Sequence, residues 1–355
     1  MNEIGQRLME AEVKGKKVRY TVLVQTVAYD EWARILWSDA EKREAVRVVY
    51  DTLWQHNAFW RRLHKLHLFS RLPGRRLWIG KYLSDMDISK EEQNYIFISD
   101  VNICMRNPEF APYLKMEYGA RVILFILNPL KRKGKKGYVK GISVSRLKKW
   151  YDLVITIDPR DAEDFDLGLI PAIYSRIETA EKREIKRDLI FVGREKGREG
   201  LLEELHHLLR SKNVNTEFDI CGQGEDKGAG WEYISYIPYG KIIRKSLEAN
   251  CILEILQEGQ TGITQRTMEA LAYNKKLLTN NKNLKNMPFY NGEYMQIFER
   301  PEEIRIDFIT ERVPVDYGYR DEYSSGVFLD RAVRLLQEKE QGAEAGKYSG
   351  CERRG

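Results

Sequence analysis

The chain has 355 residues and a formal net charge of +6, with 43% hydrophobic and 32% charged residues. This length allows about two domains of ordinary size, and the composition excludes a collagen-like chain, a disordered acidic chain and a disulfide-dense mini-scaffold. No apolar run approaches the roughly 20 residues of a membrane-spanning helix, and the charged N-terminus lacks the apolar stretch of a signal peptide. Four cysteines lie far apart without metal-ligand spacing, as in proteins of a reducing cytosol. We therefore expect a cytoplasmic protein.

Positive charge is concentrated in two windows of the first half. Residues 52–84 contain seven Lys/Arg and residues 131–149 contain nine, and neither window contains an acid. Within the first window, aromatic and leucine residues recur at helical spacing among the cations, which is typical of a basic amphipathic helix at a membrane surface. A core helix with a basic outer face is the other interpretation of this window. The glycines of 131–140 favour a mobile, solvated loop. We expect these windows to contact an anionic membrane at the inner face of the cell membrane, and no nucleic acid.

Short apolar strands alternate with stretches long enough for crossover helices. In the first half the predicted strands are residues 19–24, 95–99, 121–127 and 152–157. In the second half the predicted order is strand 189–193, helix 201–209, strand 216–221, strand 234–237, helix 241–249, strand 251–255, helix 264–273 and strand 276–279. This alternation is typical of parallel sheets and predicts two Rossmann-like, doubly wound α/β domains facing across a cleft.

The predicted organisation has four parts. An N-terminal Rossmann-like domain covers residues 1–170, and a C-terminal Rossmann-like domain covers 171–326. A terminal amphipathic helix covers 327–340, and the polar, glycine-containing residues 341–355 are expected to be a disordered tail.

Phosphate-binding chemistry follows the first two strands of the second series. Gly193 ends one strand and is followed by Arg194, Lys196 and Arg198, at the point where a helix begins. Glycine allows the backbone to approach a ligand, helix N-termini favour anions, and arginine binds phosphate oxygens in pairs. The next strand is followed by Gly222 and Gly224, although a lone G-x-G turn is weak evidence by itself.

The third cluster lies between the strand 251–255 and the next helix. Its candidate ligand-binding residues are Gln260, Thr261, Gly262, Thr264, Arg266 and Glu269. The glycine frees backbone amides, the threonines cap the helix or donate to phosphate, and the glutamate accepts from ribose hydroxyls. A capped helix with an exposed Glu and Arg is the structural alternative.

The segments VGREKGR, DICGQG and GQTGITQRTMEALAYNKKLLTNN resemble the C-terminal domain of GT-B glycosyltransferases, over roughly residues 188–298. More closely, they resemble bacterial enzymes of lipopolysaccharide and capsular polysaccharide biosynthesis. The resemblance implies a nucleotide-sugar donor, no cofactor, no obligatory metal and a last helix that crosses back to the first domain. By position, Arg194 and Lys196 match the diphosphate-binding pair, and Glu269 matches the second of two glutamates in the retaining branch. The first glutamate of that pair falls at Thr261, which is not acidic.

The resemblance therefore implies a metal-independent, retaining, hexosyltransferase-like enzyme. Negative charge develops on the leaving nucleoside diphosphate, and preorganised cations lower that barrier. We expect Arg194, Lys196 or Arg198, Arg266 and the amides near Gly262 to supply them. Asp100, at the end of strand 95–99, is a candidate base or acceptor ligand, with a strand-end or capping role as its structural alternative. The expected acceptor is a saccharide, lipid-linked in cell-surface polysaccharide biosynthesis.

Three other interpretations stay open. Asp85 with Asp87, and Asp164 with Asp166, fit the metal-binding pattern of a GT-A transferase, but residues 84–93 favour a helix start with a capping box between Ser89 and Glu92. A GT-B-fold sugar-nucleotide epimerase or phosphorylase would act without an acceptor. A non-catalytic membrane- or anion-binding module is the third. The histidines at 64, 67, 206 and 207 are expected to be satisfied surface residues rather than metal ligands.

Overall fold

The computed structural model describes residues 15–24, 30–50, 57–70, 73–178, 183–222, 231–234 and 237–351. The chain forms two compact units. Unit 1 comprises residues 1–175 and 323–355, and unit 2 comprises residues 176–322. Each unit is described by itself, and the cleft expected between them stays a prediction.

The described part of unit 1 contains a six-stranded sheet in the order β2-β1-β3-β4-β8-β9, and its neighbouring strands run parallel. Its strands are β1 (Val18–Leu23), β2 (Val46–Val49), β3 (Gln93–Ser99), β4 (Arg121–Ile126), β8 (Leu153–Thr156) and β9 (Gly168–Leu169). The order reverses between β1 and β3, as in flavodoxin-like sheets. The strand β2 has no counterpart among the predicted elements, because its VRVV segment is short and carries an exposed arginine.

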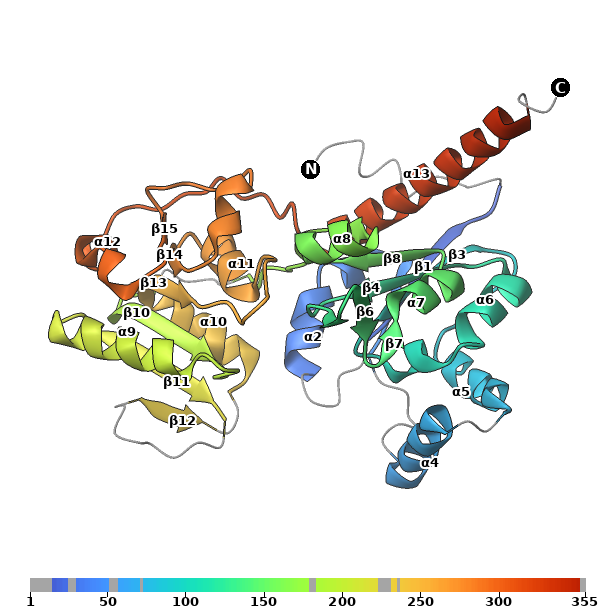
Figure 1. Ribbon diagram of the computed structural model, residues 1–355, viewed down its shortest axis with the longest axis horizontal. Helices are drawn as coiled ribbons and strands as arrows, with labels where there is room; N and C mark the ends of the chain where they lie inside the picture. Colours follow the sequence, from blue (N-terminus) through green and yellow to red (C-terminus); the bar gives the residue numbers. More distant parts are fainter. Residues whose placement is uncertain are drawn as a thin grey trace. The chain divides into compact units, whose positions relative to one another are not determined.

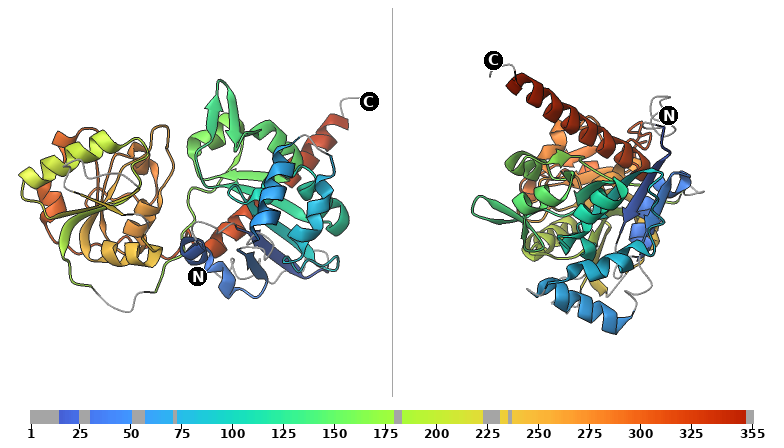
Figure 2. Two further views of the ribbon diagram at one scale, coloured as in Figure 1. Left: turned by 90° about the horizontal axis from the view of Figure 1, so that it is seen from below. Right: turned by 90° about the vertical axis from the view of Figure 1, so that its right-hand side faces the viewer.

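Residues of the central strands are buried on both faces, as parallel strands between helical layers require. In β4, Val122 and Leu124 lie in one core with α6 (Phe110–Tyr118) and α7 (Val144–Trp150). Ile123 and Phe125 lie in the other core with α2 (Asp30–Trp37) and α13 (Ser325–Cys351). Figure 2 shows helices on both sides of the sheet. The helices before the link to unit 2 are α2 (Asp30–Trp37), α4 (Ala58–Phe69), α5 (Ile79–Leu83), α6 (Phe110–Tyr118), α7 (Val144–Trp150) and α8 (Pro159–Phe165), with the 3-10 turns η1 (Ala40–Lys42), η2 (Arg75–Trp78) and η3 (Ile103–Arg106).

Residues 131–143 of the second basic window form a small antiparallel sheet, and the alternative interpretation of 131–140 as a mobile loop is wrong. Its strands are β5 (Lys131–Lys133), β6 (Lys136–Val139) and β7 (Ile142–Ser143). Arg132 forms ion pairs with Asp161 and Asp164 of α8, and Val139 and Ile142 are buried in the core. These tertiary contacts hold a segment whose own composition favours a loop.

Unit 2 contains a second six-stranded parallel sheet in the order β12-β11-β10-β13-β14-β15. Its strands are β10 (Arg187–Gly193), β11 (Thr216–Cys221), β12 (Glu232–Ile234), β13 (Ala249–Glu254), β14 (Lys276–Thr279) and β15 (Met295–Ile297). Its helices are α9 (Glu199–Ser211), α10 (Tyr239–Leu247), α11 (Gln265–Ala272) and α12 (Ile306–Thr310), with η4 (Lys282–Asn286) and η5 (Pro301–Glu303). In chain order the strands run 3-2-1-4-5-6, the arrangement of dinucleotide-binding Rossmann domains. The predicted fold class, two doubly wound α/β domains, is confirmed.

The chain leaves unit 1 near Ser175 and returns to it at Tyr323. The amide of Tyr174 donates to the carbonyl of Tyr323 at 2.7 Å, so the two connecting segments lie side by side. The last helix, α13 (Ser325–Cys351), then packs on unit 1 (Figure 1). Its Phe328 contacts Trp37 and Phe125 at ring centroid distances of 5.9 and 5.6 Å. This helix continues past residue 340 to Cys351, where the sequence analysis expects a disordered tail.

Residues 84–93 do not begin a helix, so that prediction is wrong. Glu92 forms an ion pair with Arg19 instead of closing a capping box. The side chain of Asn94 donates to the carbonyls of Ser89 and Glu92, which holds a turn that leads directly into β3. Among the described residues, no helix is both long and apolar enough to span a membrane.

Candidate functional site

The strand order of unit 2 reverses between β10 and β13, and ligands of open α/β sheets bind beyond the carboxyl ends of the strands at such a point. The loops at this place are residues 194–198, after β10, and residues 255–264, after β13. Both loops lead into helices, α9 and α11, whose N-termini therefore point toward this edge of the sheet. The sequence analysis placed its ligand-binding residues in these loops.

The loop after β10 carries three cations in five residues. Gly193 ends the strand, and a Cβ there would lie 3.1 Å from the ring of Phe191. Arg194 and Lys196 are exposed, and Lys196 adopts a left-handed backbone with a φ of 49°. Partial burial of its ammonium group, together with the charges of Arg198 and Arg194, lowers the pKa of Lys196. The structure thus gathers these three predicted residues at one place.

Arg198 holds the two loops together. Its Nε donates to the carbonyl of Glu195 at 2.9 Å, and its two Nη groups donate to the carbonyls of Arg194 and Ile255. Burial lowers the pKa of this guanidinium. Because its donors are engaged by backbone carbonyls, Arg198 positions the two loops.

The loop after β13 is held by asparagines that follow β14. Asn281 donates to the carbonyl of Gly262 at 3.2 Å, and Asn283 donates to the carbonyl of Thr261 at 3.1 Å. Gln260 closes a turn, since its amide donates to the carbonyl of Gln257. The sequence analysis missed these asparagines. The signal that marks them is a run of amide side chains directly after a buried strand.

A buried carboxylate lies beneath this loop at the end of β13. Glu254 is 1% exposed and accepts hydrogen bonds from three threonine hydroxyls, those of Thr264, Thr267 and Thr279. Thr264 also caps α11 by accepting from the amide of Arg266 at 3.0 Å. Its predicted capping role is therefore present. Glu254 was missed because it ends an otherwise apolar strand, CILE, and its partners come from α11 and β14.

Arg266 and Glu269 form an ion pair on α11. The carboxyl of Glu269 is completely buried and also accepts from the hydroxyl of Tyr239 at 2.9 Å. Burial raises the pKa of Glu269, while Arg266 and Tyr239 oppose that increase. The structure places Glu269 in the interior, so the exposed glutamate of the structural alternative is not observed. In this arrangement Glu269 orients Arg266.

The end of β11 completes the edge. The amide of Gly222 donates to the carbonyl of Ile234, which joins the ends of β11 and β12. Burial raises the pKa of the Cys221 thiol, and the charges of Arg266 and Arg194 oppose that increase. Gly224 lies outside the described residues.

Asp100 follows β3 at the point in unit 1 where the strand order reverses. It is 3% exposed, and its carboxyl accepts from the amide of Leu127 at 3.2 Å and from the side chain of Asn128 at 3.4 Å. Burial raises its pKa, and these hydrogen bonds and the charge of Lys140 oppose the increase. Asp100 thus closes the turn after β4, and its role as a base or acceptor ligand stays a prediction.

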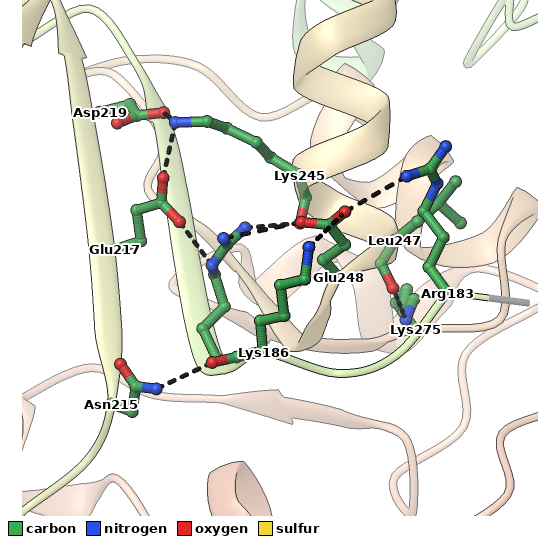
Figure 3. A network of polar contacts seen from close by, with 10 residues as sticks. Arg183, Lys186, Asn215, Glu217, Asp219, Lys245, Leu247, Glu248 and Lys275 are labelled. Carbon is green, nitrogen blue, oxygen red and sulfur yellow. Dashed lines mark hydrogen bonds and ion pairs between the residues drawn. The ribbon is translucent and has the colours of Figure 1, made fainter.

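A separate charged network ties α10 to the opposite end of the sheet. Lys245 pairs with Glu217 and Asp219 on β11 (Figure 3). Arg187 at the start of β10 pairs with Glu217 and Glu248. Each cation of this network is paired with a carboxylate, so the network stabilises the packing of α10 on the sheet. It lies at the other end of the strands from the loops that follow β10 and β13.

The described residues contain no group of three or more His, Cys, Asp or Glu side chains suited to a metal ion. Asp85, Asp87, Asp164 and Asp166 belong to unit 1, where Asp164 and Asp166 pair with Arg132 and Lys148. The surface interpretation of two histidines is wrong. His64 is buried beside Tyr82, and His206 is buried against Phe218 and Trp231, because both lie on the inner faces of their helices.

A scan against protein-family models finds no match, and a search of curated proteins finds no match either. Among solved structures, a putative UDP-N-acetylglucosamine 2-epimerase from Listeria monocytogenes is similar, with a TM-score of 0.49 and 8% identity, covering 93% of this chain and 97% of that chain. The UDP-N-acetylglucosamine 2-epimerase from Rickettsia bellii has a TM-score of 0.45 and 14% identity, covering 90% and 95%. The calicheamicin glycosyltransferase CalG4 has a TM-score of 0.35 and 12% identity, covering 94% and 98%. Since each TM-score is below 0.5, the fold class rests on the strand orders of the chain itself.

Proposed function

We propose that this chain is a nucleotide-sugar enzyme of the GT-B type, a glycosyltransferase whose unit 2 binds the donor. The observation that carries the proposal is the gathering of cations at the switch point of a 3-2-1-4-5-6 sheet. Arg194 and Lys196 are exposed there, Arg266 is held at the start of α11, and two helix N-termini point to the same edge. A nucleoside diphosphate, with its paired phosphates, has the chemistry that this edge recognises.

The proposed reaction transfers a sugar to a hydroxyl of a saccharide acceptor. The bond between the anomeric carbon and the diphosphate oxygen breaks, and its electron pair stays on the diphosphate. The acceptor oxygen bonds to the anomeric carbon as it loses its proton. Arg194, Lys196 and Arg266 stabilise the negative charge that develops on the leaving group. These cations take the role that a divalent metal plays in other transferases.

Within this proposal, Glu269 acts through Arg266. The resemblance to GT-B enzymes implies that this glutamate meets the ribose, but its carboxyl is completely buried and is paired with Arg266 and Tyr239. We therefore assign it the positioning of Arg266. Retention of configuration, a lipid-linked acceptor and a place in lipopolysaccharide or capsule biosynthesis remain parts of the proposal that rest on the resemblance.

A sugar-nucleotide epimerase is the alternative, and the edge of unit 2 suits it equally well. An epimerase that works by eliminating the diphosphate breaks the same bond between the anomeric carbon and the diphosphate and then forms it again on the epimerised sugar, so it needs the same cations. The two differ in whether an acceptor is consumed.

The test begins with thermal unfolding in the presence of nucleoside diphosphates and nucleotide sugars, with a chelator added. A ligand that binds only the folded chain raises its stability. We expect one diphosphate family to raise the unfolding temperature of the wild-type chain. Product analysis of the stabilising sugar nucleotide follows, with and without saccharide acceptors. Transfer that requires an acceptor supports the transferase, and turnover without one identifies the epimerase. No shift with any nucleotide contradicts both.

A further inference from the structure

The helix α4 lies at the outer edge of unit 1, beside α5 (Figure 1). It packs on the unit through one narrow face. His64 is 1% exposed and bonds to the hydroxyl of Tyr82, and Leu68 is 6% exposed. His67 accepts from the indole of Trp78 at 2.9 Å and contacts the carbonyl of Pro73 at 2.9 Å, which fixes its proton on Nε2. These bonds hold the helix in one orientation.

The opposite face of α4 presents large apolar side chains to solvent. Phe59, Leu63 and Leu66 recur at intervals of three and four residues, so they form one stripe along the helix. Phe59 is 67% exposed and Leu66 is 70% exposed. Phe69 on the next turn and Leu77 of η2 are exposed as well, at 64% and 80%. Most of the exposed large hydrophobic residues in the described part of the chain lie on α4 or on the adjoining turn η2, and we call them together the α4 face: Phe59, Trp60, Leu63, Leu66, Phe69 and Leu77.

Cations border the α4 face. Arg62 and Lys65 are exposed on the helix itself. The ammonium of Lys81 lies 4.4 Å from the ring centroid of Trp60, and the guanidinium of Arg106 lies 4.0 Å from that of Phe69. Arg106 also donates to the carbonyl of Lys140 at 2.6 Å, so the two basic windows meet at this place. The whole window 52–84 contains no acid.

We propose that the α4 face docks on an anionic lipid bilayer. Phe59, Leu63 and Leu66 insert among the upper acyl chains, and Arg62 and Lys65 contact the headgroup phosphates. Helices that lie in a membrane interface combine an apolar stripe with bordering cations in the same way. They bind the membrane because apolar side chains are buried among the acyl chains and cations are attracted to anionic lipid headgroups. Charge also argues against a second copy of this chain as the occupant, because a symmetric contact would bring the same cations together.

The test is sedimentation of the full chain with vesicles of phosphatidylcholine mixed with phosphatidylglycerol, and with phosphatidylcholine alone. We expect binding to the anionic vesicles that weakens in high salt. The double substitution Phe59→Ser with Leu66→Ser removes two exposed side chains without touching the core, and we expect it to weaken binding by about tenfold or more. Met116→Ser is the matched control, since Met116 is 67% exposed on α6, and it should bind like the wild-type chain.

Three outcomes would overturn the proposal: no binding of the wild-type chain to anionic vesicles, unchanged binding of the double variant, or equal loss in the Met116 control. Analytical ultracentrifugation of the same proteins identifies a second copy as the occupant if the wild-type chain is a dimer that the double substitution dissociates. The proposal is independent of the nucleotide site, because Arg194→Ala should leave vesicle binding unchanged even if it abolishes nucleotide binding.

Discussion

The carboxyl edges of the two sheets use charge in opposite ways. Three carboxylates lie at this edge in the described part of unit 1, and backbone amides donate to each of them. Asp100 accepts from Leu127, Asp158 caps α8, and Asp161 accepts from Leu130 at 2.8 Å. In unit 2 the buried acid of the edge, Glu254, is held by threonine hydroxyls, and cations of the loop after β10 reach solvent. In unit 1 these carboxylates are bonded by groups of the same unit. In unit 2 two of the cations after β10 are exposed to solvent, where an anion can reach them.

The largest expected effect comes from removing Glu254. The substitution Glu254→Ala leaves three threonine hydroxyls without their acceptor at a buried position. We expect a loss of about 3–5 kcal/mol in the free energy of unfolding, measured by chemical denaturation. Glu258→Ala, an exposed glutamate of the neighbouring loop, is the control and should change stability by less than about 0.5 kcal/mol. Equal effects of the two substitutions would mean that the threonine cluster does not stabilise this edge.

The basic edge is tested by Arg194→Ala. Loss of a charge-assisted hydrogen bond to the diphosphate should weaken donor binding or turnover by about 1.5–3 kcal/mol, measured by titration calorimetry and steady-state kinetics. Arg210→Ala, at an exposed arginine near the far end of α9, removes the same charge from the same unit and should have little effect. Unchanged kinetics in a folded Arg194→Ala variant would remove this residue from the site.

The acid sensitivity of unit 1 gives a third comparison. Burial and the neighbouring His67 lower the pKa of His64 to about 4, whereas the unfolded chain has the ordinary value near 6.5. Between these two values the unfolded state binds more protons than the folded state. The contribution of neutral His64 to the free energy of unfolding is therefore fully present above pH 6.5 and is lost as the pH drops toward 4. We expect a loss of about 2 kcal/mol between pH 7 and pH 5, measured by denaturation at each pH.

The variant His64→Gln should flatten this part of the pH profile. His207→Gln serves as the control, because His207 is exposed on α9 of unit 2 and should leave the profile as it is. A wild-type slope that survives in His64→Gln would place the acid sensitivity at another group.

The smallest expected effect is that of Asp100→Asn. The amide keeps an acceptor for Leu127 but turns a donor toward Asn128, which should cost about 0.5–1.5 kcal/mol at neutral pH. The pKa of Asp100 is raised in the folded chain, so on acidification the folded state takes up a proton at a higher pH than the unfolded state does. The free energy of unfolding of the wild-type chain therefore gains from this group as the pH falls through its folded pKa. The difference in stability between wild type and variant should therefore widen on mild acidification. A difference that is constant with pH would contradict the buried, protonatable carboxyl.

Local patterns predicted most of the strand and helix positions. The strands 216–221 and 276–279 are found at their predicted bounds, and the other predicted strands of unit 2 differ by up to three residues at their ends. The loops with Arg194 and Gly262 also fall where expected, after β10 and β13. These features are predictable because they depend on alternating burial and on turn residues that are neighbours in the chain.

The sequence by itself determined the alternation of strands and helices. It thereby also determined that a group of cations follows β10. Only the tertiary structure decided which polar groups are free to meet a ligand. It buried Glu269 against Tyr239, buried His64 against Tyr82, and surrounded Glu254 with hydroxyls, one of which lies 25 residues away. It also turned the basic residues 131–139 into a sheet held by Asp161 and Asp164. The physical reason is that burial and pairing depend on partners distant in the sequence, whereas helix and strand patterns depend on residues two to four positions apart.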